Sequence, residues 1–258
     1  MDQGDIATLV AFAERLADLS RPIAQRYFRS AIDVEEKPDR TPVTLADREA
    51  EAAMRGAIAR VWPNHGVVGE EFGSENAEAE HVWFLDPIDG TKGFIAGVPL
   101  FGTLIGLARG GRPLLGVIDH PALGERWVGA IGRPTTHNGA PVRCRPCAAL
   151  ERAQLFATDP GMFDGEDALR FERVRTKVRR VRFGTDCYGY GLLASGFGDL
   201  VVEADLDPTD FVPLVPVVEG AGGAVRDWQG RAIGPGSSGH LLAVGDARLL
   251  DPALALLA

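Results

Sequence analysis

The amino-acid sequence predicts a layered α/β fold, in which helices pack on mixed β-sheets. Three observations predict it: apolar residues at helical spacing over the first 60 residues, short apolar runs between Gly- or Pro-containing turns over 67–131, and alternation of both patterns thereafter. Because no linker, repeat or low-complexity stretch divides the sequence, we expect one domain, 1–258, with two lobes of approximately 1–145 and 146–258.

The first half is expected to begin with two helices. Apolar residues recur three and four positions apart from Ile6 to Ala17, which predicts a helix over 6–28. Two prolines and mixed charge predict a loop over 35–42, after which Thr44 caps a second helix that ends before Pro63. We expect strands at 67–68, 82–85, 103–108, 114–118 and 126–131.

The second half is expected to alternate strands with helices. Strands are expected at 178–183, 200–203, 224–228 and 241–244, and helices at 187–195, 210–219 and 246–257.

Composition excludes several classes of protein. The 258 residues are 45% hydrophobic with a net charge of -9, which suits a large core and argues against a nucleic-acid or anionic-membrane partner. Three cysteines and the lack of a long apolar run favour a cytoplasmic protein. Cys144 and Cys147 have C-x-x-C spacing, but without a second pair we interpret them as incidental.

Most of the negative charge lies in one segment. From Glu70 to Asp89 there are seven acids and no Lys or Arg, so this segment holds seven of the nine net negative charges. Such a run is usually a solvated loop. The alternative is a binding site for a positively charged ligand.

Two acids of this segment favour the second interpretation. The buried strand expected at 82–85 delivers Asp86 and Asp89 onto a Pro- and Gly-containing turn. Close carboxylates repel each other unless a cation or hydrogen bonds compensate, and Mg²⁺ takes oxygen ligands of this kind. An Asp-rich turn is the alternative. The spacing is neither the Asp-x-Asp of haloacid-dehalogenase phosphatases nor the Asp-Thr-Gly of aspartic proteases.

Three further acids stand at the ends of expected elements. Glu70 follows a strand, where loops gather into active sites. Asp47 stands three residues after Thr44, an arrangement typical of helix capping, and Asp210 is placed as a helix N-cap. From the residues alone, capping is the favoured role for Asp47 and Asp210.

Taken together and in order, these motifs resemble the inositol monophosphatase superfamily over residues 6–246. The resemblance implies an α/β/α/β/α fold with mixed sheets, Mg²⁺-dependent hydrolysis of a small phosphate monoester by direct attack of water, two or three ions per site, and a homodimer. The matching motifs are Val43-Thr-Leu-Ala-Asp47, Gly69-Glu-Glu71, Trp83-x-x-Asp86-Pro-Ile-Asp89-Gly-Thr91-x-x-Phe94, Asp210 and Val218-Glu-Gly-Ala-Gly-Gly223.

The resemblance also implies roles for individual residues. Asp47 and Thr91 would be catalytic, because they hold and help deprotonate the attacking water. The amides of Gly90 and Thr91, with Lys37, would bind the phosphate, and Asp210 would contact the substrate. The metal ligands would be Glu70, Asp86, Asp89, Asp210 and the carbonyl of Ile88.

Within the superfamily, the second half is most similar to the histidinol-phosphate phosphatase branch of histidine biosynthesis. The resemblance rests on Phe101-Gly-Thr-Leu-Ile-Gly-Leu107, Arg182-Phe-Gly-Thr-Asp186-Cys-Tyr-Gly-Tyr190 and Asp199-Leu-Val-Val-Glu203. Asp186 and Glu203 would pair with the ammonium group of histidinol. The segment 173–182 holds six bases and is usually a solvated face; the alternative is that Arg182, nearest Asp186, holds phosphate in its own site or across a dimer interface. Alternatively, Asp186 caps its helix and Glu203 binds any polyol hydroxyl.

Other substrates and one other class of protein stay open. Lys92-Gly-Phe-Ile95 also occurs in 3′-phosphoadenosine 5′-phosphate phosphatases, and an inositol-1-monophosphatase is the other alternative. Gly189-x-Gly191-x-x-Ala194 with Glu203 is a weak dinucleotide-binding pattern, in which we favour a packing role for the glycines. Since every matched acid and Thr91 are present, a non-catalytic relative is not favoured.

Overall fold

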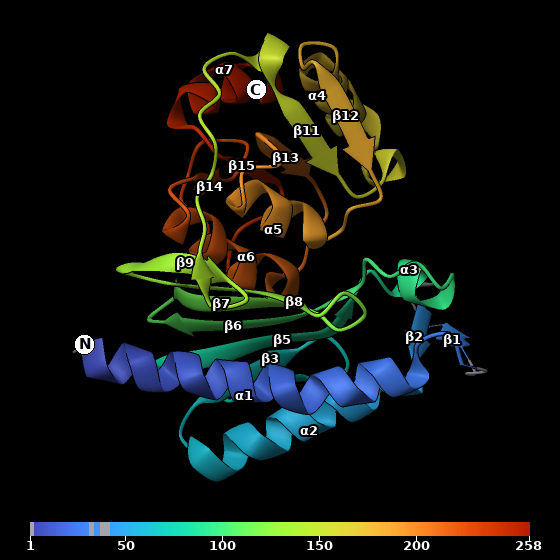
Figure 1. The fold of residues 1–258 in the computed structure, drawn as a ribbon, viewed down its shortest axis with the longest axis vertical. Coiled ribbons are helices and arrows are strands. Elements are labelled where there is room, and N and C mark those ends of the chain that lie inside the picture. Colours follow the sequence, from blue (N-terminus) through green and yellow to red (C-terminus); the bar gives the residue numbers. More distant parts are fainter. Residues whose placement is uncertain (1–2, 31–33, 37–41) are drawn as a thin grey trace.

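The computed structural model describes residues 3–30, 34–36 and 42–258. An eight-stranded sheet forms the lower half of the molecule in Figure 1, with strand order β10-β9-β8-β7-β6-β5-β3-β4. Its strands are antiparallel except for the parallel pair β3 and β5. They span β3 (Gly66–Gly69), β4 (Gly73–Glu75), β5 (His81–Asp89), β6 (Gly102–Arg109), β7 (Arg112–His120), β8 (Glu125–Ala130), β9 (Arg133–His137) and β10 (Ala140–Pro141).

Helices cover both faces of this sheet. On the lower face lie α1 (Gln3–Tyr27) and α2 (Leu45–Val61), whose buried Leu16 and Met54 pack in one cluster with Trp83 of β5. On the upper face lies α6 (Pro208–Gly220), which packs against β6, β7 and β8. A methyl group on Gly116 would lie 1.8 Å from the carbonyl oxygen of Pro213, so glycine is what allows the helix to approach this strand.

A second, five-stranded sheet lies above α6, with strand order β12-β11-β13-β15-β14. β11 pairs in parallel with β12 and β13, whereas β15 pairs antiparallel with β13 and β14. The strands span β11 (Gln154–Ala157), β12 (Arg180–Phe183), β13 (Leu200–Glu203), β14 (Ala224–Arg226) and β15 (Leu241–Val244).

The helices around this second sheet complete five layers. α5 (Tyr188–Ala194) lies with α6 between the two sheets, where Tyr190 and Phe211 share one buried cluster. α4 (Gly165–Arg175) and α7 (Leu250–Leu257) cover the outer face. The α/β/α/β/α order predicted from the family resemblance is therefore confirmed.

Short elements join the layers. β1 (Val34–Glu36) and β2 (Pro42–Thr44) pair antiparallel, so the loop expected over 35–42 is in part a hairpin. The remaining elements are α3 (Thr91–Ile95), η1 (Leu150–Arg152), η2 (Pro160–Met162) and η3 (Ala247–Leu249).

In the part of the chain that the structure describes, no helix is both long and apolar enough to cross a membrane. The division into lobes near residue 145 stays a prediction.

Candidate active site

β5 supplies the first two carboxylates of the candidate site. Residues three apart on a regular strand point to opposite faces of a sheet. The pairing of β5 with β6 shifts register between Asp86 and Asp89, and this irregularity allows both side chains to reach the same place. Asp86 is 2% exposed, and one of its carboxylate oxygens accepts a 2.9 Å hydrogen bond from the amide of Ile88.

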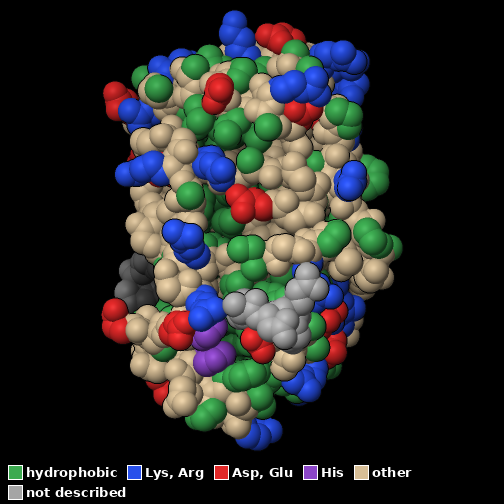
Figure 2. Space-filling view, turned by 90° about the vertical axis from the view of Figure 1, so that its left-hand side faces the viewer, with side chains coloured by type: hydrophobic (Ala, Val, Ile, Leu, Met, Phe, Trp, Pro, Cys, Tyr) green, Lys and Arg blue, Asp and Glu red, His purple; other side chains and the backbone are tan. Residues whose placement is uncertain are grey.

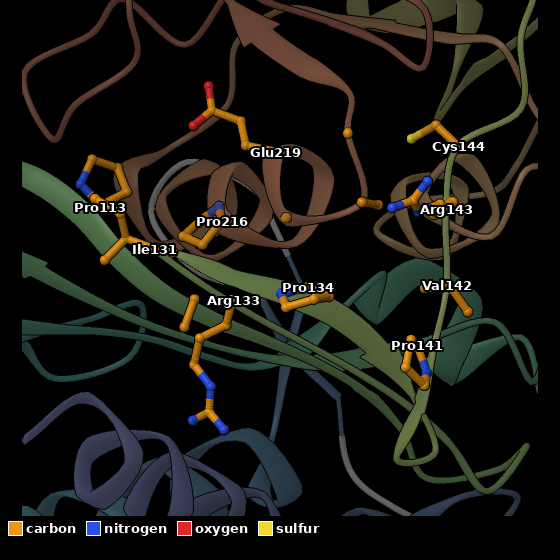
Figure 3. Close-up of a pocket in the computed structure, with 15 residues that line it drawn as sticks. Pro113, Ile131, Arg133, Pro134, Pro141, Val142, Arg143, Cys144, Pro216 and Glu219 are labelled. Atoms are coloured by element: carbon orange, nitrogen blue, oxygen red, sulfur yellow. The ribbon is translucent and has the colours of Figure 1, made fainter. Parts of the chain in front are cut away.

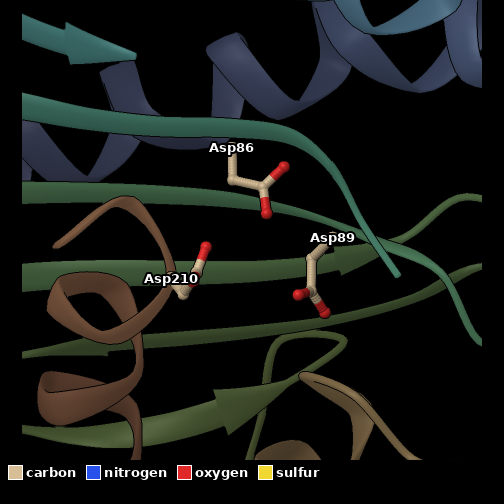
Figure 4. A group of neighbouring side chains, drawn as sticks. All are labelled: Asp86, Asp89 and Asp210. Carbon is tan, nitrogen blue, oxygen red and sulfur yellow. The ribbon is translucent and has the colours of Figure 1, made fainter. Parts of the chain in front are cut away.

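The third carboxylate comes from the start of α6. Asp207, not Asp210, is the N-cap, so the N-cap position expected for Asp210 is wrong. Asp210 is the third residue of the helix, where it accepts a 2.9 Å hydrogen bond from the amide of Asp207 in a capping box. Figure 4 shows the Asp86, Asp89 and Asp210 side chains converging, with one oxygen of each within 4.8 Å of the others.

The electrostatics of these three aspartates indicate a cation site. Burial, followed by the charges of Glu70, Asp89 and Asp210, raises the pKa of Asp86 well above its ordinary value. The pKa values of Asp89 and Asp210 are also raised, again mainly by burial. A group of carboxylate oxygens that repel one another fits a hard divalent cation such as Mg²⁺.

Glu70 lies beside the three aspartates and is positioned by main-chain contacts. Its amide donates a 3.1 Å hydrogen bond to the carbonyl of Leu85, next to the β3–β5 pairing. Its charge contributes to the raised pKa values of Asp86, Asp89 and Asp210. The structure therefore places this predicted ligand near the three aspartates.

A residue that the sequence reasoning missed, Glu51, organises the turn around Glu70. Glu51 is fully buried in α2 and accepts hydrogen bonds from the amides of Glu71 (2.7 Å) and Phe72 (3.2 Å) and from Arg55 (2.7 Å). Its position four residues after Asp47, on the same helix face, is the signal that could have identified it. Glu51 thus ties the Glu70 turn to α2.

Gly69 lies directly against Glu51, which leads to a first prediction. A methyl group on Gly69 would lie 1.9 Å from one carboxylate oxygen of Glu51 and 2.8 Å from the other. We expect Gly69→Ala to destabilise the protein by about 2 kcal/mol and to lower kcat at least about tenfold, because the Glu70 turn must move. Urea unfolding and phosphatase assays measure both effects.

The matched control is Gly56→Ala in α2, because a methyl group there would meet no atom within 4 Å. It should be neutral or stabilise the helix by about 0.5 to 1 kcal/mol. If Gly69→Ala behaved like this control, the positioning role of Glu51 would be wrong.

Asp47 combines helix capping with an unpaired oxygen. Its Oδ2 accepts hydrogen bonds from the amide (2.9 Å) and the hydroxyl (2.5 Å) of Thr44, so the predicted capping arrangement is confirmed. Its Oδ1 is buried without a hydrogen-bond partner among the residues that the structure describes. A buried, unpaired carboxylate oxygen is unfavourable in a purely structural residue, and it suits a residue that binds water or a cation.

Burial raises the pKa of Asp47 to about 6, with the charge of Glu70 contributing, and this predicts a pH-dependent stability. Because the folded-state pKa lies above the unfolded value near 3.8, ionisation of Asp47 makes the folded protein less stable as pH rises from about 4 to about 6. In metal-free protein, we expect the free energy of unfolding of Asp47→Asn to rise by about 2 to 3 kcal/mol relative to that of wild type between pH 4 and pH 7. Urea unfolding of both proteins at both pH values measures this change. A stability difference between variant and wild type that is the same at pH 4 and pH 7 would contradict it.

The segment after Asp89 starts α3. Gly90 has φ +80° at the N-cap position, and Thr91 is the first residue of the helix. The Thr91 hydroxyl donates a 3.0 Å hydrogen bond to the carbonyl of Ile88, the predicted main-chain ligand. The structure thus places Ile88, Asp89, Gly90 and Thr91 together in one turn.

Asp186 reaches the same turn from the five-stranded sheet side. Its carboxylate oxygen would lie 3.2 Å from a methyl group on Gly90, and the next amide, that of Cys187, donates a 2.8 Å hydrogen bond to Asp89. Burial and the Asp89 charge raise the pKa of Asp186 to about 7, which the charge of Lys92 partly opposes. Cys187 is the N-cap of α5 and no side chain caps it, so the alternative capping role of Asp186 is wrong.

Glu203 lies at the end of β13 and is 2% exposed. It accepts hydrogen bonds from the amide (3.0 Å) and the hydroxyl of Thr158 and from the hydroxyl of Tyr190 (2.8 Å). Burial raises its pKa to about 7, with contributions from the charges of Asp89 and Asp186. Thr158 was missed, because it follows β11, a strand that the sequence analysis did not predict.

Lys37, Arg182, Gly189 and Gly191 are the remaining candidate residues. Lys37 is outside the described residues. Arg182 is exposed on β12, the edge strand, and no hydrogen bond joins it to Asp186 within the described part of the chain. Gly189 and Gly191 lie inside α5, where a methyl group on either would approach Thr185 or Trp127 to 2.8 Å, which supports packing and not dinucleotide binding.

A cavity of about 800 Å³ lies apart from these residues, between the end of α6, β8, β9 and the segment that follows (Figure 3). Pro113, Ile131, Arg133, Pro216 and Glu219 are among the residues that line it, and none of the predicted site residues that the structure describes does. On the face seen in Figure 2, acidic and basic side chains are interspersed.

Fold and site together define a metal-dependent phosphatase, with a carboxylate cluster at the end of β5 and the start of α6. The inositol monophosphatase family matches residues 5–255. The bifunctional phosphatase IMPL2, chloroplastic, of Arabidopsis thaliana is 45% identical over 97% of this chain and 75% of its own length. The chain belongs to the inositol monophosphatase family.

Two further similarities differ in the substrate that their names give. A histidinol-phosphatase of Chlorobaculum parvum is 38% identical over 85% of both chains. The solved structure of an inositol monophosphatase from Zymomonas mobilis has a TM-score of 0.90 and 45% identity, covering 97% of this chain and 98% of that one.

Proposed function

We propose that the protein is a Mg²⁺-dependent phosphatase that hydrolyses L-histidinol phosphate in histidine biosynthesis. The observation that carries the proposal is the position of Asp186 and Glu203, two acids that are close enough to Asp89 to respond to its charge. Histidinol bears an ammonium group and an imidazole, which such acids bind better than they bind a neutral polyol. The name of the Chlorobaculum relative supports the same substrate.

In this proposal, Asp86, Asp89, Asp210, Glu70 and the carbonyl of Ile88 hold two or three Mg²⁺ ions. The observations that fit this are the all-oxygen donor set and the raised pKa values of the aspartates. When bound, the ions neutralise phosphate charge and lower the pKa of water.

The chain's own residues then orient the reacting groups. The Thr91 hydroxyl and the unpaired Oδ1 of Asp47 hold the attacking water, and the Asp47 carboxylate receives its proton. The amides of Gly90 and Thr91, with Lys37 and Arg182, hold the phosphate, and Asp210 also contacts the substrate. Asp186 and Glu203 hold the ammonium end.

Hydrolysis of inositol 1-phosphate is the second candidate function. The observation that favours it is that the Glu203 carboxylate accepts hydrogen bonds from the hydroxyls of Thr158 and Tyr190, the kind of donor that a polyol offers. The name of the Zymomonas structure agrees with it. A homodimer and a cytoplasmic location stay predictions.

Phosphate release from four esters tests the substrate. We expect kcat/KM for L-histidinol phosphate to exceed that for inositol 1-phosphate, 3′-phosphoadenosine 5′-phosphate and fructose 1,6-bisphosphate by at least about tenfold. Asp186→Asn should raise KM for histidinol phosphate about tenfold and leave KM for inositol 1-phosphate within about twofold. A preference for inositol 1-phosphate, or equal effects of Asp186→Asn on both substrates, would overturn the histidinol assignment but not the metal mechanism.

A further inference from the structure

An arginine-lined cavity lies at the opposite end of the strands that carry the specificity residues. β11 and β13 lead toward Thr158 and Glu203 at one end, and at the other end Gln154 and Asp199 line a cavity of about 430 Å³. This volume is within the range of small-molecule sites. Five arginines line it: Arg145, Arg152, Arg179, Arg180 and Arg248.

Two of the five arginines are neutralised by acids. Asp199, 1% exposed, accepts hydrogen bonds from Arg145 at 2.8 and 2.5 Å and from the amide of Gln154 at 2.7 Å, so both of its oxygens are occupied. Arg248 makes a two-bond pair with Asp246 at 2.9 and 2.5 Å. These pairs leave no free acid lining the cavity in the described part of the chain.

The other three arginines have no acidic partner among the described residues. Arg152 ends the 3₁₀ turn η1 shortly before β11, Arg179 directly precedes β12 and Arg180 begins it, and all three are exposed. The amides of Arg179 and Arg180 both donate to the carbonyl of Ala153, which fixes their main chain beside β11. Three unneutralised positive charges therefore converge on one cavity of a chain whose net charge is -9.

The chemistry of the lining indicates the ligand. Guanidinium groups bind phosphate oxygens through two parallel hydrogen bonds, and several on one cavity favour a multivalent anion. The apolar lining is small, namely Pro146, Cys147, Ala148 and Ala153, so it offers little surface to an apolar ligand.

We propose that this cavity binds a triphosphate group, at a site separate from the catalytic one. The strands between the two sites are four residues long, which is about 13 Å of extended chain. The ligand is either inorganic triphosphate or the triphosphate of a nucleotide, because both present the same charges to Arg152, Arg179 and Arg180.

Isothermal titration calorimetry of the full chain tests the proposal, with tripolyphosphate and ATP as the two probes. The titration is run on Mg²⁺-loaded protein and on protein freed of metal by a chelating resin. In the metal-free protein the acidic cluster of the catalytic site repels anions, so binding measured there does not come from that site. We expect binding in both preparations, weakened by added salt. Equal affinity for the probes identifies the triphosphate alone as the determinant, whereas tighter binding of ATP identifies a nucleotide.

The variants locate the site. Arg179→Gln/Arg180→Gln should weaken binding to metal-free protein about 100-fold, at about tenfold for each arginine, and Arg152→Gln about tenfold. The control Arg60→Gln, an exposed arginine in the last turn of α2, should stay within about twofold of wild type. Phosphatase activity without the probes should equal that of wild type in all three variants.

Either of two results would overturn the proposal: neither probe binds metal-free wild type, or the double variant binds as tightly as the Arg60→Gln control. Both results are independent of which ester the catalytic site hydrolyses.

Discussion

Asp89→Asn is expected to lower kcat by at least about 10³-fold, because it removes one of the three carboxylates that converge on the candidate metal site. The substitution keeps the shape of the side chain and an oxygen that accepts from the amide of Cys187. The same change should raise the melting temperature of metal-free protein, since the pKa of Asp89 is raised by burial and by the Glu70 charge.

Steady-state kinetics and thermal unfolding of the purified variant measure these opposite effects. Glu78→Gln is the matched control, because Glu78 belongs to the same acidic segment but is exposed. It should change kcat by less than about twofold. An Asp89→Asn enzyme that kept more than a tenth of wild-type kcat would contradict the role of the cluster.

Removal of divalent metal is expected to abolish phosphate release and to destabilise the protein. Readdition of Mg²⁺ to about 100 times its dissociation constant should restore activity and add about 3 kcal/mol of stability, or roughly 5 to 10 °C in melting temperature. The gain should be larger at pH 8 than at pH 5. The pKa values of Asp86, Asp89 and Asp210 are raised in the folded chain, so rising pH destabilises the metal-free protein.

The check is a series of melting curves and activity assays with and without chelator at both pH values. Full activity after chelation, with melting temperatures independent of Mg²⁺, would rule out metal-dependent hydrolysis at this site.

The candidate site could be predicted best where residues with an evident chemical role follow directly after a segment with a clear strand pattern. An apolar strand that ends in Asp86 and Asp89 has few explanations other than a cation site, and the strand is observed as β5. The acidic segment is divided in the structure: Glu75, Glu78 and Glu80 are exposed, whereas Asp86 is buried. The strand was expected to end at Asp86, but with the register shift β5 continues to Asp89.

The parts that escaped prediction depend on contacts between distant segments. β11 has four residues, too few for a clear periodic pattern, and its pairing with β12 and β13 is what makes it a strand. In α4, Phe171 and Val174 are buried, and the other residues are half-buried or exposed, so the helical pattern is weak. Glu51 and Thr158 act through hydrogen bonds that span 20 and 45 residues.

We propose that Asp86, Asp89 and Asp210 together bind the divalent metal that hydrolysis of the phosphate ester requires. A crystal structure of protein soaked with Mn²⁺, in which anomalous scattering identifies the ions, tests this. We expect at least one ion bonded to oxygens of all three aspartates at about 2.0 to 2.3 Å. A structure in which Mn²⁺ occupies other positions, and the three carboxylates bind no ion, would contradict it.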